Sequence, residues 1–235
     1  MLEFALDGPD LALWASAPRE IVGRALGALE MDADDLESAT AFLAATLDAP
    51  AVRGTIRLLA AGREQVVELF LGQTLVATVS VPDGGDGKNV VLGALDEFPR
   101  FVAELTDLGP RPFDPDGQSF PLPAEVAEAY AGYGVPDGAM AELEATFDGV
   151  ISSEALRAVL GTQSLRWTLD LRTDADGPSE VVLDVVDARG AGLWLLADGD
   201  VPAVAFATPV NSSAVWVLLS GAIDAALAPD LATTA

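Results

Sequence analysis

The chain contains neither cysteine nor histidine among its 235 residues. Without cysteine it can form no disulfide and offers no thiolate as a nucleophile or metal ligand. Histidine is the most frequent general base, the most frequent metal ligand and the usual switch near neutral pH. Because both residue types are missing, most zinc sites and most nucleophile–base pairs are excluded.

Basic residues are also scarce. The chain has 12 of them against 37 acidic residues, and Lys88 is its single lysine, so the formal net charge is -25. Such a charge repels phosphate backbones and anionic lipid, and binding of nucleic acid requires a basic patch. We therefore expect neither a nucleic-acid partner nor a membrane partner. The acidity favours solubility, and it fits either a charge suited to one partner or a composition shared by a whole genome.

Long apolar runs and phosphate-binding loops are missing too. No run of about 18 uncharged apolar residues is present, and the first residues lack the pattern of a secretory leader, so we expect a soluble cytoplasmic protein. No glycine-rich nucleotide motif occurs, since Asn89 follows Lys88 where a Ser or Thr is required. Residues 114–117 and 174–177 resemble calcium loops but lack the required acids, and they are predicted to be surface turns.

Catalysis by carboxylates alone remains formally open, as in glycosidases. With 37 acidic residues some pair is always adjacent, and no spacing distinguishes one pair from the others. We therefore predict a protein that is not an enzyme and that needs no cofactor and no metal.

The residues that are present point to a large core, because 51% of them are apolar. The first 50 residues read mostly as helix, with one helix beginning near Ser16 and a second running from about Asp34 to Pro50. The period then changes from 3.6 to 2. Four strands and one helix follow, at 54–60, 66–71, 75–81, 89–92 and 95–108.

A second series of elements follows residues 109–122, which are rich in proline, glycine and aspartate and are predicted to form a linker. Three short helices are expected, from Pro123, from Asp137 and from a cap at Ser152 or Ser153. Residues 164–172 show the clearest strand pattern, with alternating apolar and polar side chains. Further strands are predicted at 180–186, 192–197 and 201–207, before a last helix opened by Pro209 and Asn211.

The order of helices, four strands and a helix thus occurs twice. It predicts an α+β fold with a quasi-twofold internal repeat, in which an antiparallel sheet in two halves is flanked by helices. The halves are expected at 1–122 and 123–235, within one compact domain. The alternative is two unrelated halves that look alike because such patterns are common.

Candidate binding residues come from exposed turns and from tryptophan. Trp216 stands between two valines on the last helix, so one of the three should face outward, and tryptophan is enriched at protein interfaces. The acidic turns offer Asp83 and Asp86 in the first half, and Asp174 and Asp176 in the second. The alternatives are core packing for tryptophan and plain solvated loops for the turns.

Three passages resemble the EspG family, the cytosolic chaperones of actinobacterial type VII (ESX) secretion. They are TAFLAATLDAPAVRGTIRL at 40–58, LDEFPRFVAELTDLGPRP at 95–112 followed by GQSFPLPAEVAEA at 117–129, and GVPDGAMAELEATFDGVISSEALRAVLG at 134–161. The resemblance implies a quasi-twofold sheet between two helical groups. It also implies a chaperone that binds PE–PPE heterodimers at the tip of the PPE partner and keeps them soluble for export, without ATP or metal.

The chain departs from that family in being short and unusually acidic, and no binding residue is carried over from the family. The expected partner is a helical protein, either PE–PPE-like or another ESX substrate. Two further hypotheses remain open. One is a structural or regulatory protein-binding module unrelated to secretion, and the other is a carboxylate-dependent hydrolase. An exposed apolar patch favours a binding protein, whereas a deep pocket with two facing carboxylates favours the hydrolase.

Overall fold

The structure is a computed structural model that describes residues 2–6, 33–72, 74–81, 88–161, 163–172, 181–198 and 203–227. The helix predicted to begin near Ser16 lies outside these residues. Within them, no helix is both long enough and apolar enough to cross a membrane.

The described residues of the first half form five strands and two α-helices. They are β1 (Leu2–Leu6), α3 (Ala33–Asp48), β2 (Val52–Ala60), β3 (Arg63–Leu71), β4 (Leu75–Ser80), β5 (Lys88–Ala94) and α4 (Phe98–Leu105), with a 3-10 turn at Leu95–Glu97 before α4. The predicted helix from Asp34 and the four predicted strands are confirmed. The strand β1 was not predicted, because these residues fall in a stretch interpreted as mostly helical.

The second half repeats this order with additional helices. Its elements are β6 (Phe120–Pro123), α5 (Ala124–Tyr130), α6 (Asp137–Thr146), α7 (Ser153–Leu160), β7 (Leu165–Arg172), β8 (Val181–Asp187), β9 (Leu193–Asp198), β10 (Val204–Val210) and α8 (Ser212–Leu227), with a 3-10 turn at Arg189–Ala191. The linker prediction for 109–122 was wrong at its end, because Phe120–Pro123 pairs with β10 as an edge strand. Proline is tolerated there, since an edge strand has one side without a partner.

All ten strands form one antiparallel sheet with the order β1-β5-β4-β3-β2-β7-β8-β9-β10-β6. This order is symmetric about the β2–β7 pair, where Ile56 lies opposite Leu169. The predicted α+β fold with a quasi-twofold repeat is therefore confirmed. The division at 122/123 stays a prediction, and β6 straddles it.

The main core lies between one face of the sheet and the helices α4 and α8. Alternate residues of β7 are buried on this face, and Trp167, Leu169 and Leu171 are almost fully buried there. Phe98 of α4 and Leu219 of α8 belong to the same cluster. Burying each such side chain contributes about 1.5–3 kcal/mol, so this layer supplies much of the driving force for folding.

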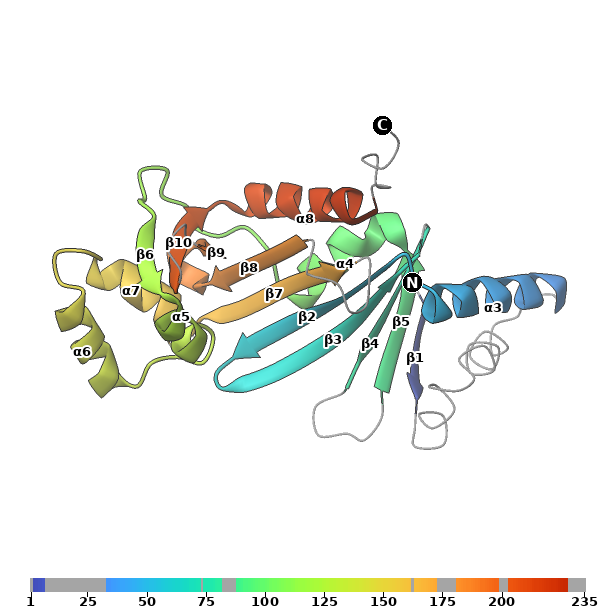
Figure 1. Ribbon diagram of the computed structural model, residues 1–235, viewed down its shortest axis with the longest axis horizontal. Coiled ribbons are helices and arrows are strands. Elements are labelled where there is room, and N and C mark those ends of the chain that lie inside the picture. Colours follow the sequence, from blue (N-terminus) through green and yellow to red (C-terminus); the bar gives the residue numbers. More distant parts are fainter. Residues whose placement is uncertain are drawn as a thin grey trace.

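On the opposite face of the sheet, the helices that the structure describes lie towards its ends. Figure 1 shows α3 at one end and α5, α6 and α7 at the other, with β3, β2, β7 and β8 between them. Helix α3 comes close to the sheet at Gly72, where an added Cβ would lie 2.9 Å from Thr46 Oγ1. The three short helices bury a second apolar cluster that includes Leu122, Leu156 and Trp194.

Side-chain caps begin two helices of the second half. Ser152 Oγ accepts the N–H of Ala155 at 3.1 Å, so Ser152 is the cap of α7. Asn211 Oδ1 accepts the N–H of Ala214 at 2.7 Å. Each bond satisfies a backbone donor that the helix cannot pair internally. The sequence had predicted a cap at Ser152 or Ser153 for the first of these helices and a start at Pro209 and Asn211 for the second.

Candidate protein-binding surface

The middle of the sheet exposes a band of side chains opposite the α4–α8 core, which we call the open face. Because side chains alternate along a strand, the residues between the buried ones must point to this side. The open face consists of Arg53, Thr55 and Arg57 on β2, Glu64, Val66, Glu68 and Phe70 on β3, Arg166, Thr168, Asp170 and Arg172 on β7, and Val182 and Asp184 on β8. It lies between two different helical groups, which we call the walls: α3 at one end and α5, α6 and α7 at the other.

Arg166 fixes one of these walls to the sheet. Its guanidinium forms two hydrogen bonds with Asp184, at 2.9 and 2.7 Å, and Nη1 donates to the carbonyl of Ala127 in α5 at 3.0 Å. Burial opposes the charge of this side chain, but the hydrogen bonds and charge of Asp184 outweigh burial and raise the pKa of Arg166. The guanidinium therefore stays charged, and its bond to Ala127 in the middle of α5 holds this helix over β7.

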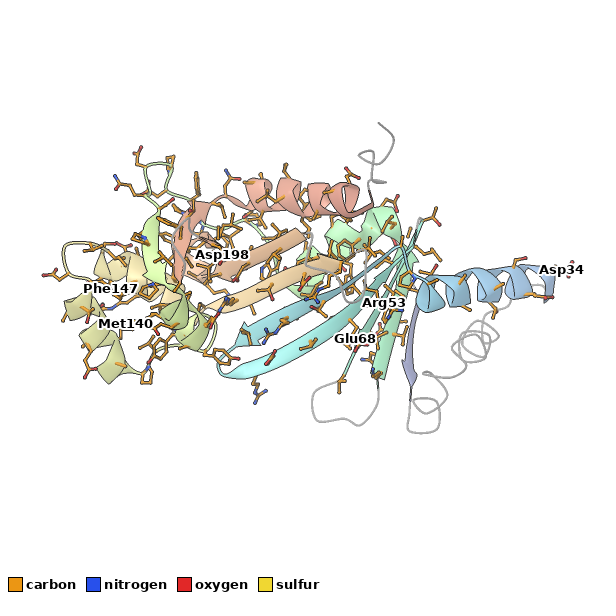
Figure 2. All side chains as sticks on the ribbon, viewed as in Figure 1. Asp34, Arg53, Glu68, Met140, Phe147 and Asp198 are labelled. Carbon is orange, nitrogen blue, oxygen red and sulfur yellow. The ribbon has the colours of Figure 1, made fainter. Side chains whose placement is uncertain are left out.

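Other cations of the open face are more accessible. Arg53 lies over the ring of Phe70, with Cζ 5.6 Å from the ring centroid, and it stands opposite Arg172 in the β2–β7 register. Arg172 in turn forms a bidentate pair with Asp170. Figure 2 shows Arg53 and Glu68 on the strands between the two helical walls. Arg53 and Arg172 therefore lie side by side, and their long side chains can reach a partner without any change in the backbone of β2 or β7.

The charge of the open face differs from that of the chain. Arg53, Arg57, Arg166 and Arg172 are on the face, and Lys88 reaches it through its ion pair with Glu68 at 3.6 Å. Five of the 12 basic residues thus meet four acidic ones, Glu64, Glu68, Asp170 and Asp184, in a chain with a net charge of -25. This band is nearly neutral and can approach a partner that the rest of the surface would repel.

The open face was not predicted as a site, although the alternation that forms it is visible in the sequence. Along 164–172 the apolar residues predict the buried side of β7, and the polar residues between them form its part of the open face. The polar members of β2, Arg53, Thr55 and Arg57, have the same spacing. That β2 and β7 are neighbours could not be read from either strand alone.

Trp216 is the one predicted binding residue that lies within the described residues. On α8 the exposed fractions are 1% for Val215, 41% for Trp216, 68% for Val217 and 40% for Leu218. The prediction that one of the residues 215–217 faces outward is thus confirmed. The exposed three form an apolar ridge, and contiguous apolar patches commonly mark interaction sites. Because the inner side of α8 packs on the core, the ridge and the open face are on opposite sides of the sheet.

The remaining predicted binding residues, Asp83, Asp86, Asp174 and Asp176, lie outside the described residues. The turn at 114–117 is described, and it is the surface turn that was predicted. Asp114 Oδ1 accepts the N–H of Asp116 at 3.0 Å, and the Asp114 carbonyl accepts the N–H of Gly117 at 3.1 Å. These bonds are those of an aspartate turn.

Comparisons with known proteins place the fold. No protein-family model matches the chain, and no curated protein sequence matches it. Among solved structures, the chain is similar to the Mycobacterium tuberculosis type VII secretion system chaperone EspG5, solved in complex with the PE25–PPE41 dimer. The TM-score is 0.56 at 13% sequence identity, and the match covers 95% of this chain and 96% of EspG5. The likeness shows that the two chains share a fold along almost their whole length.

Proposed function

We propose that this protein is a non-enzymatic cytoplasmic chaperone of a type VII secretion system, which binds a PE–PPE-like substrate on its open face and keeps it soluble for export. The observation that carries the proposal is the nearly neutral, arginine-bearing open face on an otherwise strongly acidic molecule. The shared fold with a chaperone of this type supports the same proposal.

The open face suits a helical partner for two physical reasons. First, the main-chain groups of β3, β2, β7 and β8 are paired within the sheet over most of their length, so recognition must come from side chains rather than from an added strand. Second, Arg53 and Arg172 present planar guanidinium groups that form paired hydrogen bonds with carboxylates and helix C-terminal carbonyls.

The walls would orient the partner. Helix α3 stands at one end of the open face, and the α5–α7 group stands at the other. Because the walls differ, a partner tip that fits between them in one direction does not fit when it is turned by half a rotation. The strand order of the sheet is symmetric, whereas the helices at its two ends differ, and this difference would fix the orientation of the partner.

A pull-down from the native cytoplasm, at low and at physiological salt with identification by mass spectrometry, tests the proposal first. Recovery of a PE–PPE pair or another ESX substrate supports it. Binding of the purified protein to the recovered pair then tests whether the open face is the binding surface. Arg53→Glu should weaken binding at least tenfold, because it reverses charge at the centre of a desolvated contact.

Two variants make that result specific. Arg100→Glu is a matched control, because Arg100 is an exposed arginine on α4 that pairs only with Glu104 among the described residues. It should leave binding unchanged. Trp216→Ala tests the ridge on α8. If Trp216→Ala abolishes binding and Arg53→Glu does not, the interface is the ridge. Recovery of no secretion substrate at either salt would overturn the function itself.

A further inference from the structure

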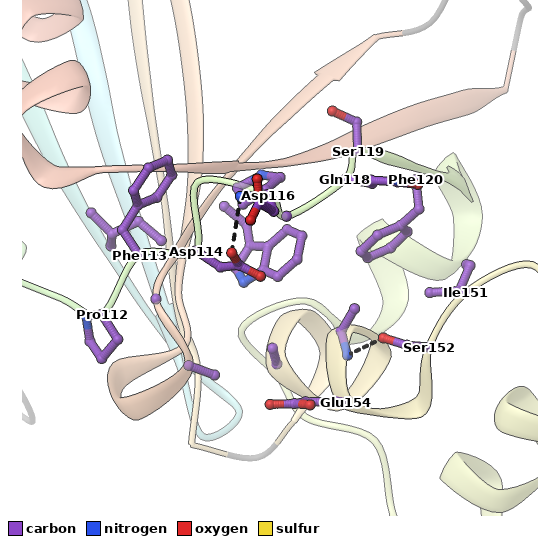
Figure 3. A pocket seen from close by; sticks show the side chains of 18 of the residues that line it. Pro112, Phe113, Asp114, Asp116, Gln118, Ser119, Phe120, Ile151, Ser152 and Glu154 are labelled. Carbon is purple, nitrogen blue, oxygen red and sulfur yellow. Dashed lines mark hydrogen bonds between the residues drawn. The ribbon is translucent and has the colours of Figure 1, made fainter.

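A pocket of about 450 Å³ lies in the second half, between residues 112–119, the beginning of α7 and the β9–β10 end of the sheet. Figure 3 shows it from close by. Apolar side chains form much of its wall, namely Phe120, Ile151, Ala155, Trp194 and Pro209. Its size and lining are those of a site for one large side chain or a small ligand.

The segment that roofs the pocket is held in place at several points. Arg111 forms a bidentate pair with the buried Asp187, with Nε–Oδ1 at 3.0 Å and Nη2–Oδ2 at 2.8 Å. Ser119 Oγ and Thr208 Oγ1 share a hydrogen bond of 2.8 Å. An added Cβ at Gly192 would lie 2.7 Å from the Pro112 carbonyl, so the segment touches β9 closely there. The pocket is therefore formed before any ligand arrives.

Trp194 carries an unused donor at this pocket. Its side chain lines the pocket and is 8% exposed, and its ring lies 5.4 Å from that of Phe120. Among the described residues, Trp194 Nε1 has no hydrogen-bond partner. Buried indole N–H groups usually find an acceptor. The nitrogen itself is covered in this structure, so an acceptor oxygen of a ligand would reach it only after a neighbouring side chain moves aside.

Carboxylates surround the apolar wall. Figure 3 shows Asp114 and Asp116 on the roof segment and Glu154 on α7 across from it. All three side chains are exposed. The pocket thus combines apolar side chains, one unpaired but covered donor and a negative rim, and a ligand that matches it needs an apolar body, an acceptor oxygen and a positive charge.

We infer that this pocket binds a short peptide segment in which an apolar residue is flanked by lysine or arginine. The apolar side chain fills the space between Phe120, Ile151 and Trp194, a backbone carbonyl accepts the N–H of Trp194, and the cation pairs with the acidic rim. A peptide carries all three features within two or three residues. The inference is independent of the proposed function, because the pocket and the open face share no residue.

The test follows the indole N–H signals of the full chain by proton–nitrogen NMR. The chain has four tryptophans, so the Trp194 signal is assigned with Trp194→Phe. The probe is the peptide acetyl-Gly-Arg-Leu-Arg-Gly-amide, and its controls replace arginine by glutamate or leucine by glycine. We expect the arginine–leucine peptide to move the Trp194 signal downfield in a saturable manner, and both control peptides to bind at least tenfold more weakly.

Variants separate the contributions to this binding. Trp194→Phe keeps the aromatic packing but removes the donor, and it should weaken peptide binding about fivefold, measured by calorimetry. Glu154→Gln should weaken it about threefold and reduce its dependence on salt. Glu125→Gln, an exposed acid on α5 outside the pocket, is the matched control and should have no effect.

Because Glu154 is exposed, Glu154→Gln should fold normally even if Trp194→Phe does not, and a melting curve checks both. Equal binding of the arginine and glutamate peptides would overturn the inference. So would a Trp194 signal that no peptide moves but that shows contact with a long-lived water, because the donor would then be satisfied by solvent.

Discussion

The two halves of the chain use one order of elements to build two different ends of the sheet. Among the described residues of the first half, the C-terminal end of a 16-residue helix, α3, contacts β3 and β4, and Asp34 marks the end of α3 farthest from the sheet in Figure 2. In the second half three shorter helices, α5, α6 and α7, form a separate apolar cluster with β8, β9 and β10. The strands are repeated, while the helical covers have diverged.

This difference distinguishes the residues that determine the fold from those that determine the binding surfaces. The symmetric strand order and the core under α4 and α8 depend on alternating apolar residues that both halves share. The α5–α7 wall depends on side chains of the second half, and the open face combines side chains of β2 and β3 with those of β7 and β8. Among the described residues of the first half, there is no counterpart of the Arg111–Asp187 clamp or of Arg166 with its bond to α5.

The largest effect is expected at the Arg111–Asp187 pair, where side-chain exposure is 16% and 2%. Arg111→Met leaves the buried Asp187 carboxylate with the N–H of Arg189 at 2.8 Å and the Arg189 guanidinium at 3.7 Å, and removing one partner of such a buried pair costs about 3–5 kcal/mol. Urea denaturation measures the loss. Arg57→Met is the matched control in the first half, because its pair with Glu64 is exposed, and it should cost less than about 1 kcal/mol.

If Arg111→Met and Arg57→Met lower the free energy of unfolding by the same amount, the predicted difference between the buried and the exposed ion pair is wrong. A double variant, Arg111→Met with Asp187→Asn, tests whether the loss comes from the uncompensated charge of Asp187. The double variant removes the uncompensated charge while keeping an oxygen that can accept the N–H of Arg189, and it should regain more than half of the stability lost by Arg111→Met.

The next effect concerns the two sides of α8. Leu219→Ala opens a cavity in the main core, where Leu219 is fully buried, and should cost about 3 kcal/mol. Its neighbour Leu218 belongs to the exposed ridge, so Leu218→Ala should change stability by less than about 0.5 kcal/mol. Thermal unfolding of the two variants measures both values. Similar losses would mean that the ridge is packed against other parts of the chain.

A pair of glycines compares the turn of the first half with the helical wall of the second. Both have a positive φ, +75° at Gly62 and +83° at Gly132. An added Cβ at Gly132 would lie 2.7 Å from the Leu59 carbonyl and 2.7 Å from Arg166 Cβ, whereas nothing lies within 4 Å of one at Gly62. Gly62→Ala should therefore cost about 1 kcal/mol, through backbone strain alone.

Gly132→Ala adds a clash with two strands to the same strain and should cost about 2–3 kcal/mol. The backbone after α5 would have to move away from β2 and β7. The two variants are compared by urea denaturation under the same conditions. Equal costs would show that the α5–α6 connection does not sit tightly on the centre of the sheet.

Much of this architecture was predictable because alternation and capping act locally. The strand pattern of 164–172, a helix cap at Ser152 or Ser153 and an outward-facing residue among 215–217 were all predicted from neighbouring residues. The pairing of β2 with β7 was not, because it joins segments more than 100 residues apart. β6 was interpreted as linker for a related reason, since a short strand with two prolines has no pattern of its own and forms only against β10.

The candidate sites show the same limit more sharply. Each residue of the open face is unremarkable in its own strand, and the face exists only because two strands from different halves meet. The pocket beside Trp194 likewise needs three segments, at 112–120, 150–158 and 191–194. Tryptophan was considered in the sequence only as core or interface, since nothing local shows whether its N–H finds an acceptor.

The smallest effect is expected at Asp107, which pairs with Arg189 and so ties the end of α4 to the turn before β9. The hydrogen bond and charge of Arg189 lower the pKa of Asp107 below its usual value. A carboxyl whose pKa is lower in the folded than in the unfolded state contributes stability above the unfolded pKa, near 4. That contribution disappears as the pH falls through the folded pKa. The melting temperatures of the natural chain and Asp107→Asn should therefore differ slightly at pH 7 and converge as the pH falls through the folded-state pKa. A difference that persists unchanged at the lowest pH would assign the contact between the two halves to packing rather than to charge.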